Sequence, residues 1–145
     1  MKAVRIIKNE RGFSLIELLI VMVILGLLAG LVGPKLFGKV DSSKQKTAKT
    51  QISLFESALD TYRLDNGRFP TSEQGLKALR EKPEGAARWK GPYLPKEIPV
   101  DPWGNAYVYR SPSEHGDFDI VSNGADNAPG GEGNDMDIVS WKDLD

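Results

Sequence analysis

The chain is organised around the stretch Arg11-Gly12-Phe13-Ser14-Leu15-Ile16-Glu17, which joins a short basic leader to an apolar run that extends to Gly33. The run over residues 15–33 is long enough to cross a bilayer as one helix. Its single charge, Glu17, lies almost at its start, and an ionised side chain in hydrocarbon costs roughly 2.5–3.5 kcal/mol. We therefore expect a partner that neutralises Glu17.

Cleavage after Gly12 would supply such a partner, because Phe13 would then carry a new α-ammonium group one helical turn from Glu17. That ammonium, on the same chain or a neighbouring one, can pair with the carboxylate and set the register of stacked helices. In a secretory signal peptide small residues follow the apolar segment, whereas here Gly12 precedes it. Residues 1–11 carry four basic side chains and one acid, so the positive-inside bias keeps the leader cytoplasmic. The alternative is an uncleaved anchor with a single span.

Beyond the apolar run, the sequence predicts that the helix continues. Pro34 removes one backbone hydrogen bond and clashes with the preceding turn, so we expect a kink there. Apolar residues then recur four and three positions apart, which is the period of one helix face, at Ala48, Ile52, Phe55, Leu59 and Tyr62. This stripe needs a surface to pack on, and the C-terminal region is the candidate. Asp65-Asn66-Gly67 is typical of the end of a helix.

The remaining sequence predicts a small α+β domain. Thr71-Ser72-Glu73-Gln74 has the pattern of a capping box that opens a short helix reaching about Arg80. Five prolines between residues 83 and 102 then predict an irregular segment. Alternating β-branched and aromatic residues predict three strands, over residues 106–110, 117–121 and 137–141. We expect a long N-terminal helix, transmembrane and then amphipathic, packed on a three-stranded antiparallel sheet.

Charge is balanced overall but uneven along the chain. The 19 basic and 20 acidic residues nearly cancel, whereas residues 35–49 hold five lysines and one aspartate, and residues 114–145 hold nine acids and one lysine. The basic stretch suits anionic lipid or the acidic faces of neighbouring subunits, or it is simply a solvated helix face. The chain has no cysteine, which excludes disulfides and thiol chemistry.

Little in the sequence indicates catalysis or nucleic-acid binding. The single histidine, His115, falls in a polar turn without a nearby nucleophile signature, so we expect a solvated loop residue. The C-terminal part is acidic, whereas a face that binds nucleic acid would be basic and rich in aromatic residues. We therefore predict no catalytic residue and no nucleic-acid partner.

The acidic loop over residues 123–137 carries the one plausible metal site. Many side-chain oxygens lie on this Gly-rich turn, and hard oxygen ligands in a flexible loop suit calcium. They belong to Asp126, Glu132, Asp135 and Asp137 and to Asn123, Asn127 and Asn134. The spacing is not that of an EF-hand. From the residues alone, a merely solvated acidic turn remains the alternative.

The leader junction resembles the prepilin family, in which the leader ends in Gly, an apolar residue follows, and a Glu stands at the fifth mature position; here these are Gly12, Phe13 and Glu17. Later motifs are similar to the major pseudopilins of the type II secretion system. They are Arg68–Leu76, Asp101–Asn105, Asp117–Ile120 and Ser122–Asp126. The leader is typical of the whole superfamily, while the later motifs separate this group from type IV pilins, which usually carry a C-terminal disulfide.

The resemblance implies a pilin-like fold and roles for several residues. A prepilin peptidase would cut between Gly12 and Phe13 and methylate the new amine of Phe13. Glu17 and Pro34 would act in assembly. The loop would hold one calcium ion.

Asp126 and Asp135 match the acidic positions of the family's calcium loop, and Asn123 and Asp137 complete our candidate ligand set. Two residues depart from the family pattern. Asn123 stands where an apolar residue is usual, and Met136 stands where Ala is usual. Asn123 offers its backbone carbonyl, and its side chain can compete as a ligand.

The implied organisation has three parts: a cleaved cytoplasmic leader over residues 1–12, a transmembrane and polymerisation helix over 13–34, and a periplasmic globular domain over 35–145. The implied function is that of the major structural subunit of a periplasmic pseudopilus, anchored by a single pass in the bacterial inner membrane, which drives export of folded proteins. Its expected partners are copies of itself, minor pseudopilins, an inner-membrane assembly platform, the prepilin peptidase and membrane lipid. The alternatives are a type IV pilin of a surface fibre for adhesion, motility or DNA uptake, and a membrane-tethered enzyme or binding module.

Overall fold

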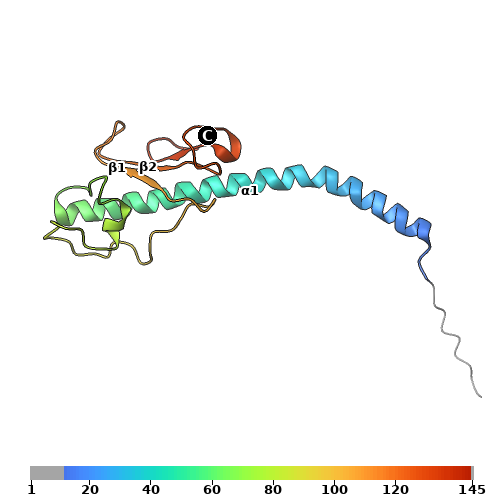
Figure 1. Cartoon of the computed structure of the whole chain (residues 1–145), viewed down its shortest axis with the longest axis horizontal. Coiled ribbons are helices and arrows are strands. Elements are labelled where there is room, and N and C mark those ends of the chain that lie inside the picture. The colour runs from blue at the N-terminus through green and yellow to red at the C-terminus, as the bar shows by residue number, and fades with distance from the viewer. Residues whose placement is uncertain (1–11, 145) are drawn as a thin grey trace, which may run out of the picture. The chain divides into compact units, whose positions relative to one another are not determined.

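A computed structural model describes residues 12–144, without the side chains of residues 34–37 (Figure 1). The leader over residues 1–11 lies outside the described residues. The chain divides into two compact units, Met1–Gly38 and Lys39–Asp145. The long helix α1, Leu15–Asn66, contributes to both units, and each unit is described by itself.

The first unit consists of the start of α1 and the residues before it. Ser14 and Glu17 cap the helix reciprocally, because the Glu17 N–H donates to Ser14 Oγ at 3.2 Å and the Ser14 N–H donates to Glu17 Oε2 at 2.9 Å. The apolar side chains that follow are exposed, Met22 by 72% and Leu31 by 69%. Among the described residues, α1 is the one helix long and apolar enough to cross a membrane. Its helical backbone continues through Pro34, so the proline does not end it, and the kink remains a prediction.

The second unit is built on the C-terminal part of α1. The stripe predicted from the sequence forms its core, with Ala48, Ile52 and Leu59 fully buried and Phe55 and Tyr62 exposed by only 1%. Burying each large apolar side chain contributes roughly 1.5–3 kcal/mol, so this helix face fixes the position of the sheet.

The predicted end of the helix is also confirmed. α1 ends at Asn66, and the Gly67 N–H donates to the carbonyl of Arg63 at 2.7 Å. Gly67 has a φ of 76°, a left-handed conformation that glycine adopts without strain.

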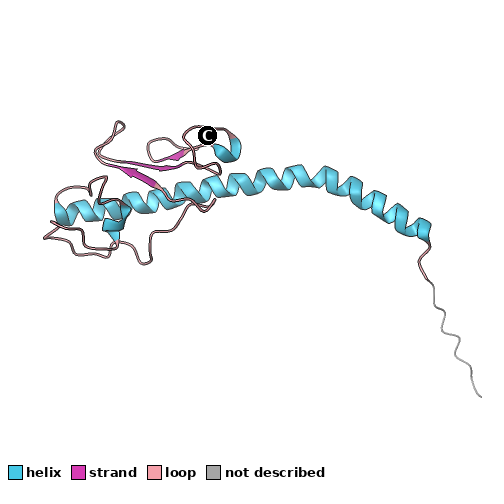
Figure 2. Cartoon of the chain, viewed as in Figure 1, coloured by secondary structure: helices cyan, strands magenta, loops and turns pink. Residues whose placement is uncertain are grey.

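Three short strands form the predicted antiparallel sheet, which Figure 2 shows beside the second half of α1. They are β1 (Val108–Arg110), β2 (Asp119–Ser122) and β3 (Ile138–Val139), with β2 in the centre. Tyr109 pairs with Ile120, and Ser122 pairs with Ile138. This register directs Tyr109, Ile120 and Ile138 into the core, where each is at most 8% exposed. The α+β prediction is confirmed, although every strand is shorter than its sequence pattern.

The connection between helix and sheet is mostly irregular, as the prolines predict. The capping box forms, because the Thr71 N–H donates to Gln74 Oε1 at 3.0 Å and the Gln74 N–H donates to Thr71 Oγ1 at 3.3 Å. The element that follows is the short 3-10 helix η1, Leu76–Leu79, and not a longer helix. Gly75 explains the difference, since its φ of 59° and ψ of −168° interrupt helical geometry.

Candidate functional site

The first candidate site is the junction between the leader and α1. A Cβ built on Gly12 would meet no atom within 4 Å, and Phe13 is 82% exposed, so both residues of the predicted cleavage site are accessible. One oxygen of Glu17 is bonded to the Ser14 N–H. Its other oxygen makes no hydrogen bond to any described residue, which leaves it for the ammonium group that cleavage would create. The Ser-x-x-Glu pattern was a visible capping-box signal that our sequence interpretation missed.

The second candidate site is the loop between β2 and β3, which holds all four candidate metal ligands. Two glycines let its backbone segments approach closely. A Cβ on Gly124 would lie 2.8 Å from the carbonyl oxygen of Asn134, and one on Gly131 would lie 2.5 Å from that of Asp135. Both glycines have positive φ angles, 64° and 92°. The loop is therefore closed on itself at two points, at which a larger side chain does not fit.

The candidate ligands take different places in this loop. Asp126 is exposed and its Oδ1 accepts the N–H of Ala128 at 3.0 Å, while Asp137 Oδ2 accepts the N–H of Gly130 at 2.8 Å. Asn123 follows β2 directly, and Asp135 ends the 3-10 helix η2, Gly133–Asp135. Within residues 12–144, no three acidic or histidine side chains lie close enough to share one metal ion. The four residues thus lie in one closed loop, but their side chains do not meet at one common position.

Two oxygens in the loop nevertheless have no hydrogen-bond partner. Asp137 Oδ1 and Asn134 Oδ1 are both buried and make no hydrogen bond within the described part of the chain. Buried acceptors without partners are uncommon, because leaving them unpaired costs the desolvation of the group. Oxygens of this kind are ligands that calcium prefers, so the donor chemistry of the loop is compatible with that ion.

A buried carboxylate from another segment supports this loop. Asp101 is only 2% exposed, and its Oδ1 accepts the N–H groups of Trp103 at 3.0 Å and Asn105 at 2.8 Å. Its Oδ2 accepts the hydroxyl of Ser122 at 2.6 Å, at the end of β2. Asn105 in turn donates to the carbonyl of Gly124 at 3.0 Å. The Asp-Pro-Trp-Gly-Asn motif therefore fixes the start of the loop, a role that we did not predict, because Ser122 is distant in sequence.

Removing this carboxylate is expected to destabilise the domain strongly. Asp101→Ala leaves three donors without their acceptor, and each buried unpaired group costs ~1–3 kcal/mol, so we expect a loss of about 3 kcal/mol. Urea unfolding of the domain from Lys39 onward measures it. Asp117→Ala, which removes an exposed carboxylate, is the control. A loss below about 1 kcal/mol for Asp101→Ala would contradict the role assigned to this residue.

α1 is tied to the same loop by two polar side chains. Gln45 donates to the carbonyl of Gly133 at 2.7 Å. The ammonium group of Lys49 donates to the carbonyls of Val139, Ser140 and Lys142, at 2.9, 3.2 and 2.6 Å. This lysine of the basic stretch therefore faces its own domain, and it is not available to lipid or to neighbouring subunits.

His115 is more engaged than the solvated turn residue that we expected. Its Nδ1 lies 2.8 Å from Asp119 Oδ2, and its ring stacks on Trp141 with a centroid distance of 3.7 Å. The Asp119 side chain is 8% exposed. His115 is an exposed turn residue, as predicted, but its contact with Trp141, 26 positions along the chain, has no local sequence signal. These contacts tie the turn before β2 to the segment after β3.

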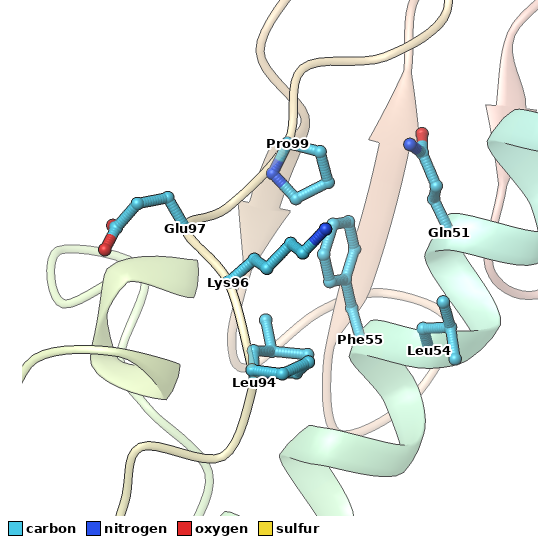
Figure 3. A pocket seen from close by; sticks show the side chains of 8 residues that line it. Gln51, Leu54, Phe55, Leu94, Lys96, Glu97 and Pro99 are labelled. Carbon is cyan, nitrogen blue, oxygen red and sulfur yellow. The ribbon is translucent and has the colours of Figure 1, made fainter.

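A cavity of about 220 Å³ lies between α1 and the irregular segment (Figure 3). Leu54 and Phe55 line it from α1, and Leu94 and Pro99 line it from the facing segment. Lys96 and Glu97 are the charged residues at this groove. Its walls are otherwise mostly apolar, and the Glu97 carboxylate points away from Phe55 and pairs with Arg80 at 3.2 Å.

Comparison with known proteins distinguishes a major pseudopilin from the alternatives given above, a type IV pilin and a membrane-tethered enzyme or binding module. The family described as type II secretion system (T2SS), protein G, matches residues 35–141. The chain belongs to this family. A second description, the prokaryotic N-terminal methylation motif, matches residues 7–33.

Individual relatives agree with the family match. The type II secretion system core protein G of Pseudomonas aeruginosa is 47% identical over 138 residues, which is 92% of this chain and 96% of the relative. The type II secretion system core protein G of Vibrio cholerae is 45% identical over 137 residues, which is 92% of this chain and 93% of that relative. The crystal structure of the major pseudopilin from the type 2 secretion system of enterohaemorrhagic Escherichia coli matches with a TM-score of 0.64 and 38% identity, over 74% of this chain and 95% of that one. The chain is thus a major pseudopilin and not a type IV pilin, and its family is one of structural subunits.

Proposed function

We propose that the chain is inserted into the bacterial inner membrane by residues 13–34 and polymerises, through its helices, into a periplasmic pseudopilus that drives export of folded proteins. The observation that carries this proposal is the exposure of the whole apolar face of α1 in the first unit, from Leu15 at 87% to Val32 at 47%. Such a surface requires lipid before assembly and neighbouring helices after it. A head-to-tail contact that does not close on itself then generates a filament.

The second unit exposes another face of α1 that suits contact between subunits. Exposed and uncharged residues recur three and four positions apart along it, at Thr47, Thr50, Leu54, Ser57, Thr61 and Leu64. We call this set the uncharged stripe. Its four hydroxyl groups donate to the carbonyls four residues earlier, at 2.9–3.1 Å. Because these groups are already satisfied, the stripe can be buried against a neighbouring helix without unpaired polar atoms.

A charge on the uncharged stripe is expected to block assembly without affecting the fold. Leu54 is 59% exposed, so Leu54→Glu changes the stability of the isolated domain by less than about 0.5 kcal/mol. In the filament the same carboxylate would be buried without a partner, which opposes incorporation. The measurement is the amount of the protein in sheared, sedimented filaments, with Ser53→Glu, an exposed neighbour outside the stripe, as the matched control. Equal filament yields for the two variants would contradict this role.

Cleavage of the leader should occur after Gly12, by a peptidase of the inner membrane that also methylates the new amine. The absence of a side chain at Gly12 lets the extended backbone enter a narrow protease site. Mass spectrometry of the mature protein should find an N-methylated Phe13 at its N-terminus, and Gly12→Val should accumulate as the precursor. A mature N-terminus at another residue would overturn this part of the proposal.

We also propose that the closed loop binds one calcium ion. Asp137 and Asn134 would supply the two buried oxygens that have no partner, and Asn123, Asp126 and Asp135 would supply further side-chain or carbonyl oxygens. The ion would neutralise like charges that are held in one loop. In the pseudopilus, the chain would assemble with minor pseudopilins and an inner-membrane platform. The energy for polymerisation would come from outside the chain.

A further inference from the structure

A basic pocket of about 240 Å³ lies at the end of α1 in the second unit. Tyr62 and Asn66 line it from the helix, Arg68 follows the helix, and Ala86, Ala87 and Arg88 belong to a turn. Both arginines are exposed, and neither makes an ion pair or a side-chain hydrogen bond within residues 12–144. Two guanidinium groups thus share one concave surface that lacks an acidic side chain.

Backbone donors add to the positive character of this pocket. The turn over residues 83–89 closes through the N–H groups of Ala86 and Trp89, which donate to Pro83 and Ala86 carbonyls at 3.3 and 3.1 Å. The N–H groups of Ala87 and Arg88 make no hydrogen bond to any described residue. Successive free N–H groups in a turn form a concavity that binds anions.

The polar groups on the helix side are compatible with an anionic ligand. Asn66 uses its amide nitrogen to donate to the Tyr62 carbonyl at 3.0 Å, and its Oδ1 is buried without a partner. That oxygen can accept one arginine N–H and leave the other guanidinium donors for a ligand. Burial raises the pKa of the Tyr62 hydroxyl, and the positive charge of Arg68, which lines the same pocket, opposes this rise.

The opposite end of the same unit is acidic. The hydrogen bond from Gln45 to Gly133 holds the acidic loop beside residue 45 of α1, whereas the basic pocket begins at Tyr62. Seventeen residues of helix separate these points by roughly 25 Å. Glu132, next to Gly133, is exposed, and its carboxylate has no partner within the described part of the chain.

We propose that the basic pocket of one subunit binds the carboxylate of Glu132 of a second copy of this chain. The contact rests on the proposed polymerisation, because subunits that point the same way along a filament bring the end of one domain that holds the basic pocket to the acidic end of another. Arg88, with the free N–H of its turn, is the central donor, and Arg68 is the second. Two copies of the chain would thus meet through different surfaces. Such a contact is heterologous and fits an open filament.

Cross-linking tests the contact directly, because the chain has no cysteine. Filaments that carry both Arg88→Cys and Glu132→Cys, treated with a short bis-maleimide, should give a ladder of covalent dimers, trimers and longer species. Each single variant should give no ladder. The matched control pairs Lys77→Cys, exposed on η1, with Glu132→Cys, and it should also give no ladder. A ladder of equal intensity from the control pair would overturn the proposal.

Charge exchange provides the second measurement. Arg88→Glu and Glu132→Arg should each lower filament yield roughly two- to fivefold, the range expected for an exposed ion pair, and the combined exchange should restore it. If wild-type filaments form but neither ladder nor rescue is seen, this contact is wrong while polymerisation stands. If the wild-type chain forms no filaments, both the proposed function and the proposed contact are wrong.

Discussion

Replacing Glu17 by alanine is expected to abolish incorporation into filaments while leaving leader cleavage and membrane insertion intact. A carboxylate in hydrocarbon costs roughly 2.5–3.5 kcal/mol, and in our proposal the α-ammonium group of Phe13 on a neighbouring subunit would remove that cost in the assembled state. Without the free energy that charge pairing contributes on assembly, incorporation should be roughly a hundredfold weaker. The measurement is the ratio of sedimented filament to membrane-bound subunit, together with the mass of the mature N-terminus.

The structure adds the controls that this experiment needs. Glu17 also caps α1, since its carboxylate accepts the N–H of Ser14. Glu17→Gln keeps an oxygen that can cap the helix but removes the charge, so it should fail to assemble as Glu17→Ala does. Ser14→Ala removes the reciprocal bond to the Glu17 N–H and keeps the charge, so it should assemble. Normal assembly of Glu17→Gln would show that capping, and not charge pairing, explains the residue.

The second large effect is expected from calcium. If the loop binds calcium as proposed, free calcium at about a hundred times its dissociation constant should add roughly 2.7 kcal/mol to the stability of the domain from Lys39 onward, because the ion would bind only the folded loop. In a domain of this size that raises the melting temperature by several degrees. Magnesium should substitute poorly, since it demands a tighter octahedral shell than a loop of carboxylates and carbonyls provides. Thermal unfolding with calcium, magnesium or chelator measures the difference.

Variants of the loop separate calcium binding from general destabilisation. Asp126→Ala, Asp135→Ala and Asp137→Ala should each reduce the calcium response. Asp117→Ala, whose carboxylate pairs with Arg63 on the surface, should leave it unchanged. A melting temperature that chelation does not alter, or a full calcium response in all three loop variants, would refute the calcium site.

Elements with a regular period could be predicted from the sequence. The core stripe from Ala48 to Tyr62 is confirmed residue by residue, because a spacing of four and three leaves only one face of a helix to bury. The end of α1 at Asn66, just before Gly67, and the capping box at Thr71 are confirmed as well, since each depends on residues within four positions. The three strands lie where the sequence predicts them but are shorter, because the alternating pattern does not indicate where cross-strand pairing stops.

Features that join distant segments were missed. The carboxylate of Asp101 binds Ser122, and His115 stacks on Trp141, and no local pattern connects either pair. Lys49 belongs by composition to a basic stretch, yet its ammonium group is bound by three carbonyls of its own C-terminal segment. The four candidate metal ligands lie in the loop between β2 and β3, where local turns at Asp126 and Asp137 already use one oxygen of each carboxylate.

The central claim is that this chain polymerises to drive export of folded proteins, and secretion by the bacterium that carries it is the most direct test. Deleting the gene should leave exported proteins in the periplasm, and supplying the wild-type chain should return them to the medium, whereas supplying Glu17→Ala should not. Twitching motility should be unaffected in all three strains. Normal secretion without the chain, or lost twitching with normal secretion, would contradict the account.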